Sequence, residues 1–527
     1  MRLAKPAATI ATEGETPSKF AAVCVVLFPL LVVAAVLFRL ANVALDHLAC
    51  PSDLVYESPN LATIQQIRAG QPIYDARVYD SGPFVLTMYT PLYHYLVAKL
   101  PQREGNPFHT GRIVSMLAML GAAGLLFLPG RASQSWILPV VAVGAMFCVR
   151  PIVSNTVYLR HDPLGLLLSG AAVVAIAGPS RRWPVIALAG LLAAAAFLTK
   201  QSFLACGVSC VLYLFFRHRR QTALFAACWA VPILIAAAIL YVYRGEGGVW
   251  FSWFTAPRNP LDSGIFLENW RRMLEQPVFG TLVVLASTVL IVALRREGTR
   301  VWLNSPYAIY WILATLALVP ISAKVGAATN VFFEFVLAGL LWLTHEFRQV
   351  TRGKLASSRP LLLLLGLCFV QAMELAMAQP PDYSFVDRRP AKIAGESRMY
   401  SPQELLEGRI ALVRQELAAL DQKPTRLLNL TQEVWITASL TNEILLNDPL
   451  AYALLWDQNA LSNAQLKAAI GRQEFDVILL PRADTPPEAE FWAHRLPAWQ
   501  EIVQAVEEDY YTRQHGIYRY MTPRFKP

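Results

Sequence analysis

Apolar stretches of membrane-spanning length recur along this chain of 527 residues, and they constrain its fold more than any other feature. The first stretch, 20–43, is too long for the core of a signal peptide, and no small-residue cleavage site follows it. We therefore predict that it is retained as a transmembrane helix, the first of about eleven spans. The further spans are predicted at 109–129, 136–149, 162–178, 184–198, 203–216, 221–243, 277–294, 302–320, 331–345 and 360–378.

The composition supports a membrane protein. Apolar residues make up 55% of the chain and charged residues only 16%, whereas about a quarter of the residues of a soluble domain are charged. The net charge of +9 is typical of basic cytoplasmic loops, so it does not indicate a nucleic-acid partner. Most of the cysteines lie in apolar runs, where cysteine acts as a small hydrophobic residue, so no disulfide framework is expected.

Basic residues alternate with the apolar stretches in a way that assigns each loop to one side of the membrane. Lys5 and Lys19 precede the first span, which predicts a cytoplasmic N-terminus. Every second short loop after that is basic, and the only acids in these loops are Glu297 and Glu346. The alternation holds along the whole chain, so the residues after the last span are predicted to lie outside. The basic residues of the inner loops are Arg131, Arg181, Arg182, Arg217, His218, Arg219, Arg220, Arg295, Arg296, Arg300, Arg348, Arg352, Lys354 and Arg359.

The chain is predicted to be an all-α polytopic membrane protein with a small C-terminal α/β domain outside the membrane. Residues 1–19 are predicted to form a cytoplasmic tail, and residues 20–378 a transmembrane domain whose long first outer loop spans 44–108. Residues 379–527 are predicted to form an extracytoplasmic domain. In the last part the composition becomes that of an ordinary globular protein. Two short apolar runs there, 426–430 and 475–480, indicate buried strands, and helical periodicity covers 402–420 and 461–472.

Two lysines stand at membrane depth on the outer side. Between Lys99 and Lys354 the chain has only Lys200 and Lys324, and both interrupt apolar segments away from the basic inner loops. Ionisable groups at this depth are costly, and they usually line a cavity or pair with one another. The alternative is that each lysine extends its amine to the outer headgroups. Their matching depth favours a shared site for an anionic ligand.

A third polar cluster, Arg160-His161-Asp162-Pro163, opens a span at its outer end. Asp162 followed by proline has a structural explanation, because it matches a helix N-cap with proline in the first turn. Arg160 has no such explanation, since a cation is unfavourable at a helix N-terminus. We expect Arg160 to pair with a carboxylate or a phosphate.

The first outer loop contains two predicted helices. The segment 57–70 begins with Glu57, has apolar residues at helical spacing and ends at a glycine, which predicts an amphipathic helix on the outer membrane surface. The segment 89–96 is an aromatic helix started by proline, and it contains Tyr93 and His94. For Glu57 the alternative is a capping or solvated acid, and for His94 a packed residue of the interfacial aromatic belt. The sequence has no metal-ligand spacing of His or Cys and no Gly-rich phosphate loop.

This arrangement resembles the C-type (GT-C) membrane glycosyltransferases, and it is most similar to the bacterial branch related to protein mannosyltransferases and aminoarabinose transferases. Members open the first outer loop with an Asp-Glu pair and a helix that ends near a glycine, which Tyr56-Glu57 and Gly70 match with a tyrosine in place of the first acid. The Pro-Pro-Leu-aromatic stretch of the family is matched by Thr90-Pro-Leu-Tyr93, and the arginine that follows it by Arg112. Two further segments look like variants of this superfamily, 198–202 and 326–334.

The resemblance implies a transferase that takes a sugar from a polyprenyl-phosphate carrier and passes it, with inversion, to a glycan, lipid or protein acceptor. It also implies a multi-pass protein of the bacterial inner membrane, with the site and the C-terminal domain on the periplasmic side. The acceptor needs a base, which we assign to Glu57. The departing phosphate needs cations, for which the candidates are Lys200, Lys324, Arg160 and Arg112. The candidate substrate-pocket residues are Tyr56, Tyr74, Tyr93, His94, Asn330 and Glu334.

The residues leave two other functions open. A transporter or flippase of lipid-linked sugars would use the charges as a pathway, and it predicts matched broken helices in two halves of the chain, which the sequence does not have. A non-catalytic partner that binds the lipid carrier during envelope assembly is compatible with the altered Tyr56-Glu57 pair. A divalent metal such as Mg²⁺ or Mn²⁺ is compatible with the site, and the sequence does not require one.

Overall fold

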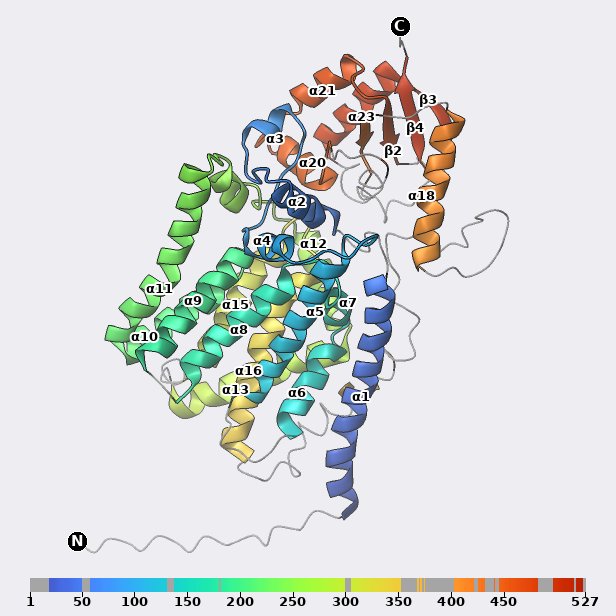
Figure 1. Cartoon of the computed structure of the whole chain (residues 1–527). Helices are drawn as coiled ribbons and strands as arrows, with labels where there is room; N and C mark the ends of the chain where they lie inside the picture. The colour runs from blue at the N-terminus through green and yellow to red at the C-terminus, as the bar shows by residue number, and fades with distance from the viewer. Residues whose placement is uncertain are drawn as a thin grey trace, which may run out of the picture.

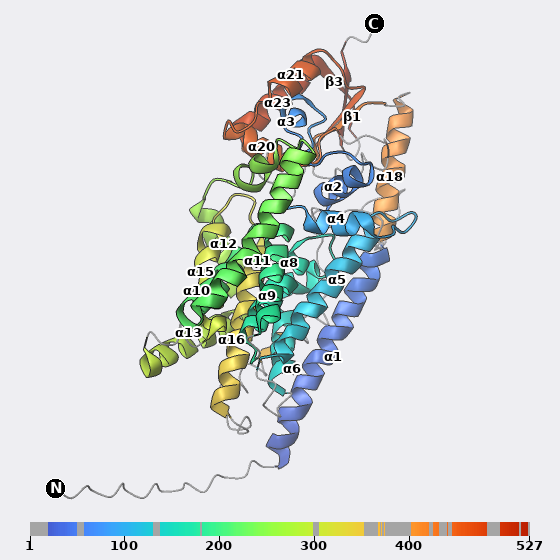
Figure 2. The same ribbon diagram turned by 60° about the vertical axis from the view of Figure 1, so that its left-hand side comes forward.

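The structure, a computed structural model, is a bundle of helices with a small α/β domain on one end (Figure 1). The long first helix α1 (Lys19–Ala49) begins at the end of the bundle that is far from the C-terminal sheet, and both views show the bundle helices running alongside one another (Figure 2). The residues that the structure describes are 19–49, 57–129, 137–179, 182–298, 305–351, 367–368, 370–371, 374, 402–420, 425–431, 440, 445–481, 496–515 and 518–524.

Each predicted span from 20–43 to 331–345 coincides with a helix, as expected where a chain must satisfy its backbone groups without water. Three described helices, at 109–127, 219–242 and 277–295, are both long and apolar enough to cross a membrane. Most of the span predicted at 360–378 lies outside the described residues. The bundle helices after α1 are α5 (His109–Gly124), α6 (Ile137–Cys148), α8 (Asp162–Ala177), α9 (Trp183–Thr199), α10 (Leu204–Arg217), α11 (Arg219–Ala238), α13 (Pro277–Glu297), α15 (Pro306–Ser322) and α16 (Phe333–Thr351).

Small residues let the bundle helices approach one another closely. α8 packs on α5 and α9, and α9 packs in turn on α11. At Gly190 of α9, an added Cβ atom would lie 2.8 Å from the backbone oxygen of Phe225 and 2.7 Å from the Cβ atom of Cys228, both on α11. A larger residue would therefore force the two helices apart, and small residues at such crossings are typical of membrane bundles.

Large apolar side chains cover the outward faces of the bundle. Trp183, Leu188 and Val242 are among those that are more than half exposed, at 72%, 53% and 77%. An exposed apolar surface of this kind is expected where helices face lipid.

The first outer loop folds into three short helices, so the helices predicted at 57–70 and 89–96 are confirmed. α2 ends before Gly70, whose φ of +71° falls in the left-handed region that favours glycine. The three helices are α2 (Ser58–Arg68), α3 (Arg77–Ser81) and α4 (Leu92–Lys99).

The predicted position of α2 on the membrane surface is wrong. Its Leu61 and Ile64 are buried in a cluster that contains Tyr93 of α4 on one side and Leu479 of the C-terminal domain on the other. Figure 1 shows α2 between the bundle and this domain. The apolar stripe that the sequence shows is therefore covered by protein.

Short elements complete the outer and inner ends of the bundle. They are η1 (Leu125–Phe127), α7 (Arg150–Asn155), η2 (Ile239–Tyr243), η3 (Phe251–Thr255), α12 (Ser263–Leu274) and η4 (Thr329–Phe332). The amphipathic α12 begins at Asp262, whose carboxylate accepts a hydrogen bond from the backbone N–H of Ile265 at 2.8 Å.

The C-terminal residues form a four-stranded sheet in the order β1-β2-β4-β3. β1 and β2 are parallel, with Leu428 opposite Ile478, and the other pairs are antiparallel. The strands predicted at 426–430 and 475–480 are confirmed as β1 and β2. The described elements are α18 (Pro402–Ala419), β1 (Leu427–Asn429), α20 (Pro449–Asp457), α21 (Ala464–Gly471), β2 (Val477–Leu480), α23 (Pro497–Asp509), β3 (Tyr510–His515) and β4 (Arg519–Pro523).

Candidate functional site

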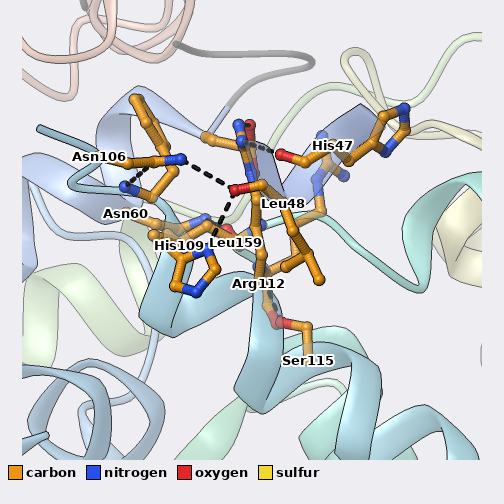
Figure 3. Close-up of polar contacts among 11 residues, drawn as sticks. His47, Leu48, Asn60, Asn106, His109, Arg112, Ser115 and Leu159 are labelled. Carbon is orange, nitrogen blue, oxygen red and sulfur yellow. Dashed lines mark hydrogen bonds and ion pairs between the residues drawn. The ribbon is translucent and has the colours of Figure 1, made fainter. Parts of the chain in front are cut away.

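A buried ion pair fastens the first outer loop to the bundle. Glu57 and Arg112 have fully buried side chains, and the guanidinium donates to both carboxylate oxygens, at 2.9 Å from Nε to Oε1 and 2.5 Å from Nη2 to Oε2. Arg112 also donates to the backbone oxygen of His47 in α1, at 2.6 Å (Figure 3). The backbone N–H of Leu159 donates to Glu57 Oε1 at 2.5 Å. The pair thus joins the loop, α1, α5 and the turn before α8.

Further hydrogen bonds hold the same turn and the end of α1. Asn60 of α2 donates to the backbone oxygen of Leu159 at 3.1 Å, and its side-chain oxygen lies 3.0 Å from Nε2 of His94. Asn106 donates to the backbone oxygen of Leu48 at 2.9 Å, and Nδ1 of His109 lies 3.0 Å from the same oxygen (Figure 3). The turn that leads into α8 therefore rests on a rigid support.

Beyond that turn, Asp162 is the centre of a second polar cluster. Its Oδ1 atom accepts a hydrogen bond from the Lys200 amine at 2.7 Å and from the Asn330 amide at 3.1 Å. Asp162 opens α8, Lys200 follows the end of α9, and Asn330 lies in η4, so three outer helix ends meet here. Asp162 makes no capping hydrogen bond, and its interpretation as a helix N-cap is therefore wrong.

Aromatic rings surround this cluster. The Tyr89 ring lies 4.0 Å from the His161 ring, centroid to centroid, and the Lys200 amine lies 5.3 Å from the centroid of the Tyr89 ring. The His94 ring is 6.4 Å from the His161 ring. Burial lowers the pKa of His94 to about 4, so this histidine is neutral at physiological pH.

Several buried polar atoms of this cluster have no hydrogen-bond partner among the described residues. They are both ring nitrogens of His161, Oδ2 of Asp162 and Nδ1 of His94. Oδ2 of Asp162 and Nε2 of His161 lie 3.6 Å apart, beyond hydrogen-bonding distance. Buried polar groups are nearly always hydrogen-bonded in native proteins, so these atoms indicate a place where a polar ligand binds.

Lys324 lies beside the cluster, in the connection between α15 and η4. Its amine donates to the backbone oxygen of Pro257 at 3.0 Å, which ties it to the second outer loop. Burial and the nearby charge of Lys200 lower its pKa. The charge of Lys200 therefore disfavours the charged form of Lys324, and an anion bound beside Lys324 would favour it.

The remaining predicted pocket residues lie behind or outside the cluster. Tyr74 is fully buried and donates its hydroxyl to the backbone oxygen of Tyr89 at 2.6 Å. Tyr93 donates to the backbone oxygen of Gly111 at 3.0 Å. Glu334 accepts from the hydroxyl of Tyr310 at 3.1 Å, inside the bundle. Tyr56 lies outside the described residues.

Of the candidate residues, the structure brings Lys200, Asn330 and His94 together around Asp162. Lys324 and Glu334 lie within electrostatic reach of Lys200. Arg160 is within electrostatic reach of Asp162, and its backbone carbonyl accepts from Ser115 at 2.8 Å. Arg112 and Glu57 form a separate pair, on the other side of the Leu159 turn.

Sequence reasoning missed Tyr89 and His161, and it undervalued Asp162. A signal was present, because His161 and Asp162 adjoin Arg160 at a predicted outer span end. Tyr89 precedes a stretch of proline and aromatic residues, and a tyrosine is common in such a segment near a membrane surface, so the sequence offers no reason to assign it to the site. Among the described residues, no group of three or more His, Cys, Asp and Glu side chains is arranged to hold a metal ion.

Comparison with known proteins bears on the fold. No protein-family model matches the chain, and no curated protein matches it. Among solved structures, ArnT from Cupriavidus metallidurans bound to undecaprenyl phosphate matches with a TM-score of 0.53 at 13% identity, over 94% of this chain and 97% of that one. The same protein in the apo state gives a TM-score of 0.55 at 12% identity, over the same shares of the two chains. This chain shares the ArnT fold.

A second solved protein has the same overall architecture. The archaeal oligosaccharyltransferase AglB from Archaeoglobus fulgidus, in complex with an inhibitory peptide and a dolichol-phosphate, matches with a TM-score of 0.53 at 12% identity. The match covers 94% of this chain and 74% of that one. The predicted resemblance to GT-C glycosyltransferases is thus confirmed at the level of the fold.

Proposed function

We propose that this chain is an integral-membrane glycosyltransferase that takes a sugar from a polyprenyl-phosphate carrier and passes it to an acceptor at the outer face of the membrane. The observation that carries the proposal is the cluster around Asp162, where Lys200 and buried, unpartnered polar atoms meet at the outer end of the bundle. The fold supports it, because ArnT was solved with undecaprenyl phosphate and AglB with a dolichol-phosphate.

The two lysines suit the donor phosphate. When the bond between the sugar and the phosphate breaks, the carrier phosphate gains a negative charge, which pre-placed cations stabilise. Lys200 and Lys324 would supply these cations, with Arg160 as a third. Arg112 is not assigned to the phosphate, because its guanidinium donates to both oxygens of Glu57 and to the backbone of His47. The Lys200 amine, by contrast, has three N–H groups and donates one hydrogen bond to Asp162.

The sugar would lie among the polar groups that have no partner. His94 is neutral and has a free ring nitrogen, and His161 has two, so both can hydrogen-bond to sugar hydroxyls. The Asn330 amide and the Tyr89 ring border the same place. Tyr74 and Tyr93 would support these residues from behind.

Glu57 was the base in the hypothesis from sequence, and its contacts favour a different role. Both of its oxygens are bound to Arg112, and one also accepts from the backbone of Leu159. A carboxylate with these contacts is poorly placed to take a proton from an acceptor. We propose that Glu57 positions the turn that carries Arg160 and Asp162.

The membrane orientation belongs to the same proposal. The C-terminal domain and the helices α2 and α4 of the first outer loop lie at one end of the bundle, and the basic turn between α10 and α11 lies at the other (Figure 1). The Asp162 cluster adjoins α2, whose Asn60 bonds the turn before Asp162. Basic loops mark the cytoplasmic side. The site, the C-terminal domain and the acceptor would therefore lie on the periplasmic side of a bacterial inner membrane.

A donor screen on the purified full-length chain tests this function. The protein is incubated in lipid nanodiscs with polyprenyl-phosphate sugars of several kinds and with lipid, glycan and peptide acceptors, and free polyprenyl phosphate is measured. We expect release from at least one donor that depends on an acceptor. Donor binding without release from any donor would contradict the enzymatic proposal and favour a carrier-binding protein, and movement of donor across a bilayer would favour a flippase.

A further inference from the structure

The acceptor-side base is the missing part of the proposed reaction, and most carboxylates near the site are already bound. Five of those near the outer end of the bundle contact a cation or a hydroxyl donor. The pairs are Glu57 with Arg112, Asp162 with Lys200, Glu246 with Arg244, Asp75 with Arg77, and Glu334 with Tyr310. The C-terminal domain supplies a further buried carboxylate, that of Asp448.

A segment of that domain lies along the first outer loop. The backbone N–H of Phe84 donates to the backbone oxygen of Leu445 at 2.7 Å, and the N–H of Asn447 donates to the backbone oxygen of Phe84 at 3.2 Å. The Asn447 side chain bonds both backbone groups of Leu86, each at 3.0 Å. These bonds fix the next residue, Asp448, above the loop that carries Tyr89.

The beginning of α20 is also close to Tyr89. The carboxylates of Asp448 and Asp162 and the Lys200 amine all act electrostatically on the Tyr89 phenol, so Asp448 lies near the ring that contacts His161. On the same helix, Leu450 and Leu454 come within 4.0 Å of the place where Gly326 would carry a Cβ atom, next to Lys324. The beginning of α20 therefore covers the loop that holds the second lysine.

We propose that Asp448 is the acceptor-side base, supplied to the transmembrane site by the C-terminal domain. The inference rests on the proposed function. The Asp448 carboxylate takes the proton from the acceptor hydroxyl or amine as that atom bonds to the anomeric carbon. The bond from this carbon to the phosphate oxygen breaks, and its electron pair leaves with the polyprenyl phosphate toward Lys200 and Lys324. Inversion requires the Asp448 carboxylate and the two lysines to act on opposite faces of the anomeric carbon.

The protonation of Asp448 suits this task. Burial raises the pKa of its carboxyl to about 6, although the backbone N–H groups of Ala451 and Leu450 oppose the shift. The other titratable groups that interact with it are Tyr89 of the outer loop and Tyr452 of α20, and Lys324 follows in the loop beneath α20. A base with a pKa just below the working pH is mostly ionised and still accepts a proton readily.

A structural role must be separated from a chemical one, because Asp448 also caps α20. Its Oδ1 accepts from the backbone N–H of Ala451 at 2.9 Å. Asparagine caps helices about as well as aspartate but cannot act as a base. Asp448→Asn therefore keeps the cap and removes the base. Asp262→Asn is the matched control, since the Asp262 carboxylate caps α12 with the same geometry and the change leaves the backbone pairing of this segment with the Lys324 loop in place.

The experiment measures turnover, donor affinity and melting temperature of the full-length protein in nanodiscs, with the donor and acceptor found by the screen. We expect Asp448→Asn to lose about 10²–10⁴-fold in turnover, with donor affinity and melting temperature close to those of wild type. Asp448→Glu should retain part of the turnover and the rise of activity with pH through about 6, and Asp262→Asn should behave as wild type.

Three outcomes would overturn the assignment. One is wild-type turnover in Asp448→Asn, and another is an equal loss in Asp448→Asn and Asp448→Glu, which would indicate positioning alone. The third is residual turnover in Asp448→Asn that keeps the wild-type rise near pH 6. If wild type transfers no sugar from any donor, the proposed function itself fails, so the two failures are distinguishable.

Discussion

Asp162 shares one oxygen between the Lys200 amine and the Asn330 amide, and no described residue hydrogen-bonds to its other oxygen. Glu57 is as deeply buried, but its oxygens are bound by Arg112. The first carboxylate therefore keeps capacity for a ligand, whereas the second holds protein segments together. This difference depends on tertiary partners, which the sequence does not show.

The lysines are tested through donor binding. Lys200→Ala and Lys324→Ala should each weaken binding of polyprenyl phosphate about ten- to a hundredfold, because a charge-assisted contact contributes roughly 1.5–3 kcal/mol. Binding to protein in nanodiscs is measured by titration with a fluorescent carrier analogue. Lys467→Ala is the control, since Lys467 pairs with Glu501 on the surface of the C-terminal domain. Wild-type affinity in both site variants would contradict phosphate binding and would favour the alternative that each lysine extends its amine to the outer headgroups.

Glu57→Gln separates the two roles proposed for this residue. If Glu57 is an architectural residue, the change leaves Arg112 buried without its counter-charge, and stability should fall by about 3–5 kcal/mol. If it is a base, the variant should fold normally and lose about 10²–10⁴-fold in turnover. We expect a lower melting temperature, measured by a thermal shift in nanodiscs. Glu268→Gln is the control, because its ion pairs with Arg271 and Arg272 are exposed.

At the scale of elements, hydropathy predicted the helices whose formation depends on their own sequence. Each described bundle helix forms where an apolar run excludes water from the backbone, so its position follows from its own sequence. The burial of α2 does not follow from its own sequence, because the residue that covers this helix, Leu479, lies more than four hundred residues later in the chain. β3 (Tyr510–His515) was also missed, since it is a polar edge strand without an apolar run.

The contact between α20 and the first outer loop has a test of its own. Asn447→Ala removes both hydrogen bonds to Leu86 and leaves two buried backbone groups unsatisfied, which should cost about 1–3 kcal/mol for each group. We expect a lower melting temperature and faster proteolysis within the C-terminal domain. Asn463→Ala is the matched control, because the Asn463 amide contacts only an exposed carboxylate, that of Glu501. Equal protease resistance in the two variants would show that the contact does not hold the domain in place.

At the scale of the whole molecule, the predicted sidedness of the basic loops agrees with the arrangement of the bundle ends. The first outer loop and the C-terminal domain lie together at one end of the bundle, and the basic turn between α10 and α11 lies at the other (Figures 1 and 2). The sequence predicted this polarity from the alternation of basic loops, which is a global pattern that survives an error in one boundary. It could not predict that the segment before Asp448 pairs with the first outer loop, since that depends on contacts between distant parts of the chain.

Cysteine labelling checks the orientation. Arg219→Cys and Ser462→Cys place single thiols at the α10–α11 turn and in the C-terminal domain, and both positions are exposed. Background labelling should be low, because the described native cysteines are buried or half-buried. In intact cells an impermeant maleimide should label Ser462→Cys and spare Arg219→Cys. Labelling of both positions from outside would contradict the predicted topology.

The central claim is that sugar leaves a polyprenyl-phosphate carrier at the side of the membrane where Lys200 and the C-terminal domain lie. The most direct test is transfer in proteoliposomes of known orientation, with labelled donor in the bilayer and acceptor on one side only. We predict labelled acceptor and free polyprenyl phosphate when the acceptor faces the C-terminal domain, and a strong loss of both in Lys200→Ala. Transfer to acceptor on the opposite side, or donor that stays intact while wild type binds it, would contradict the claim.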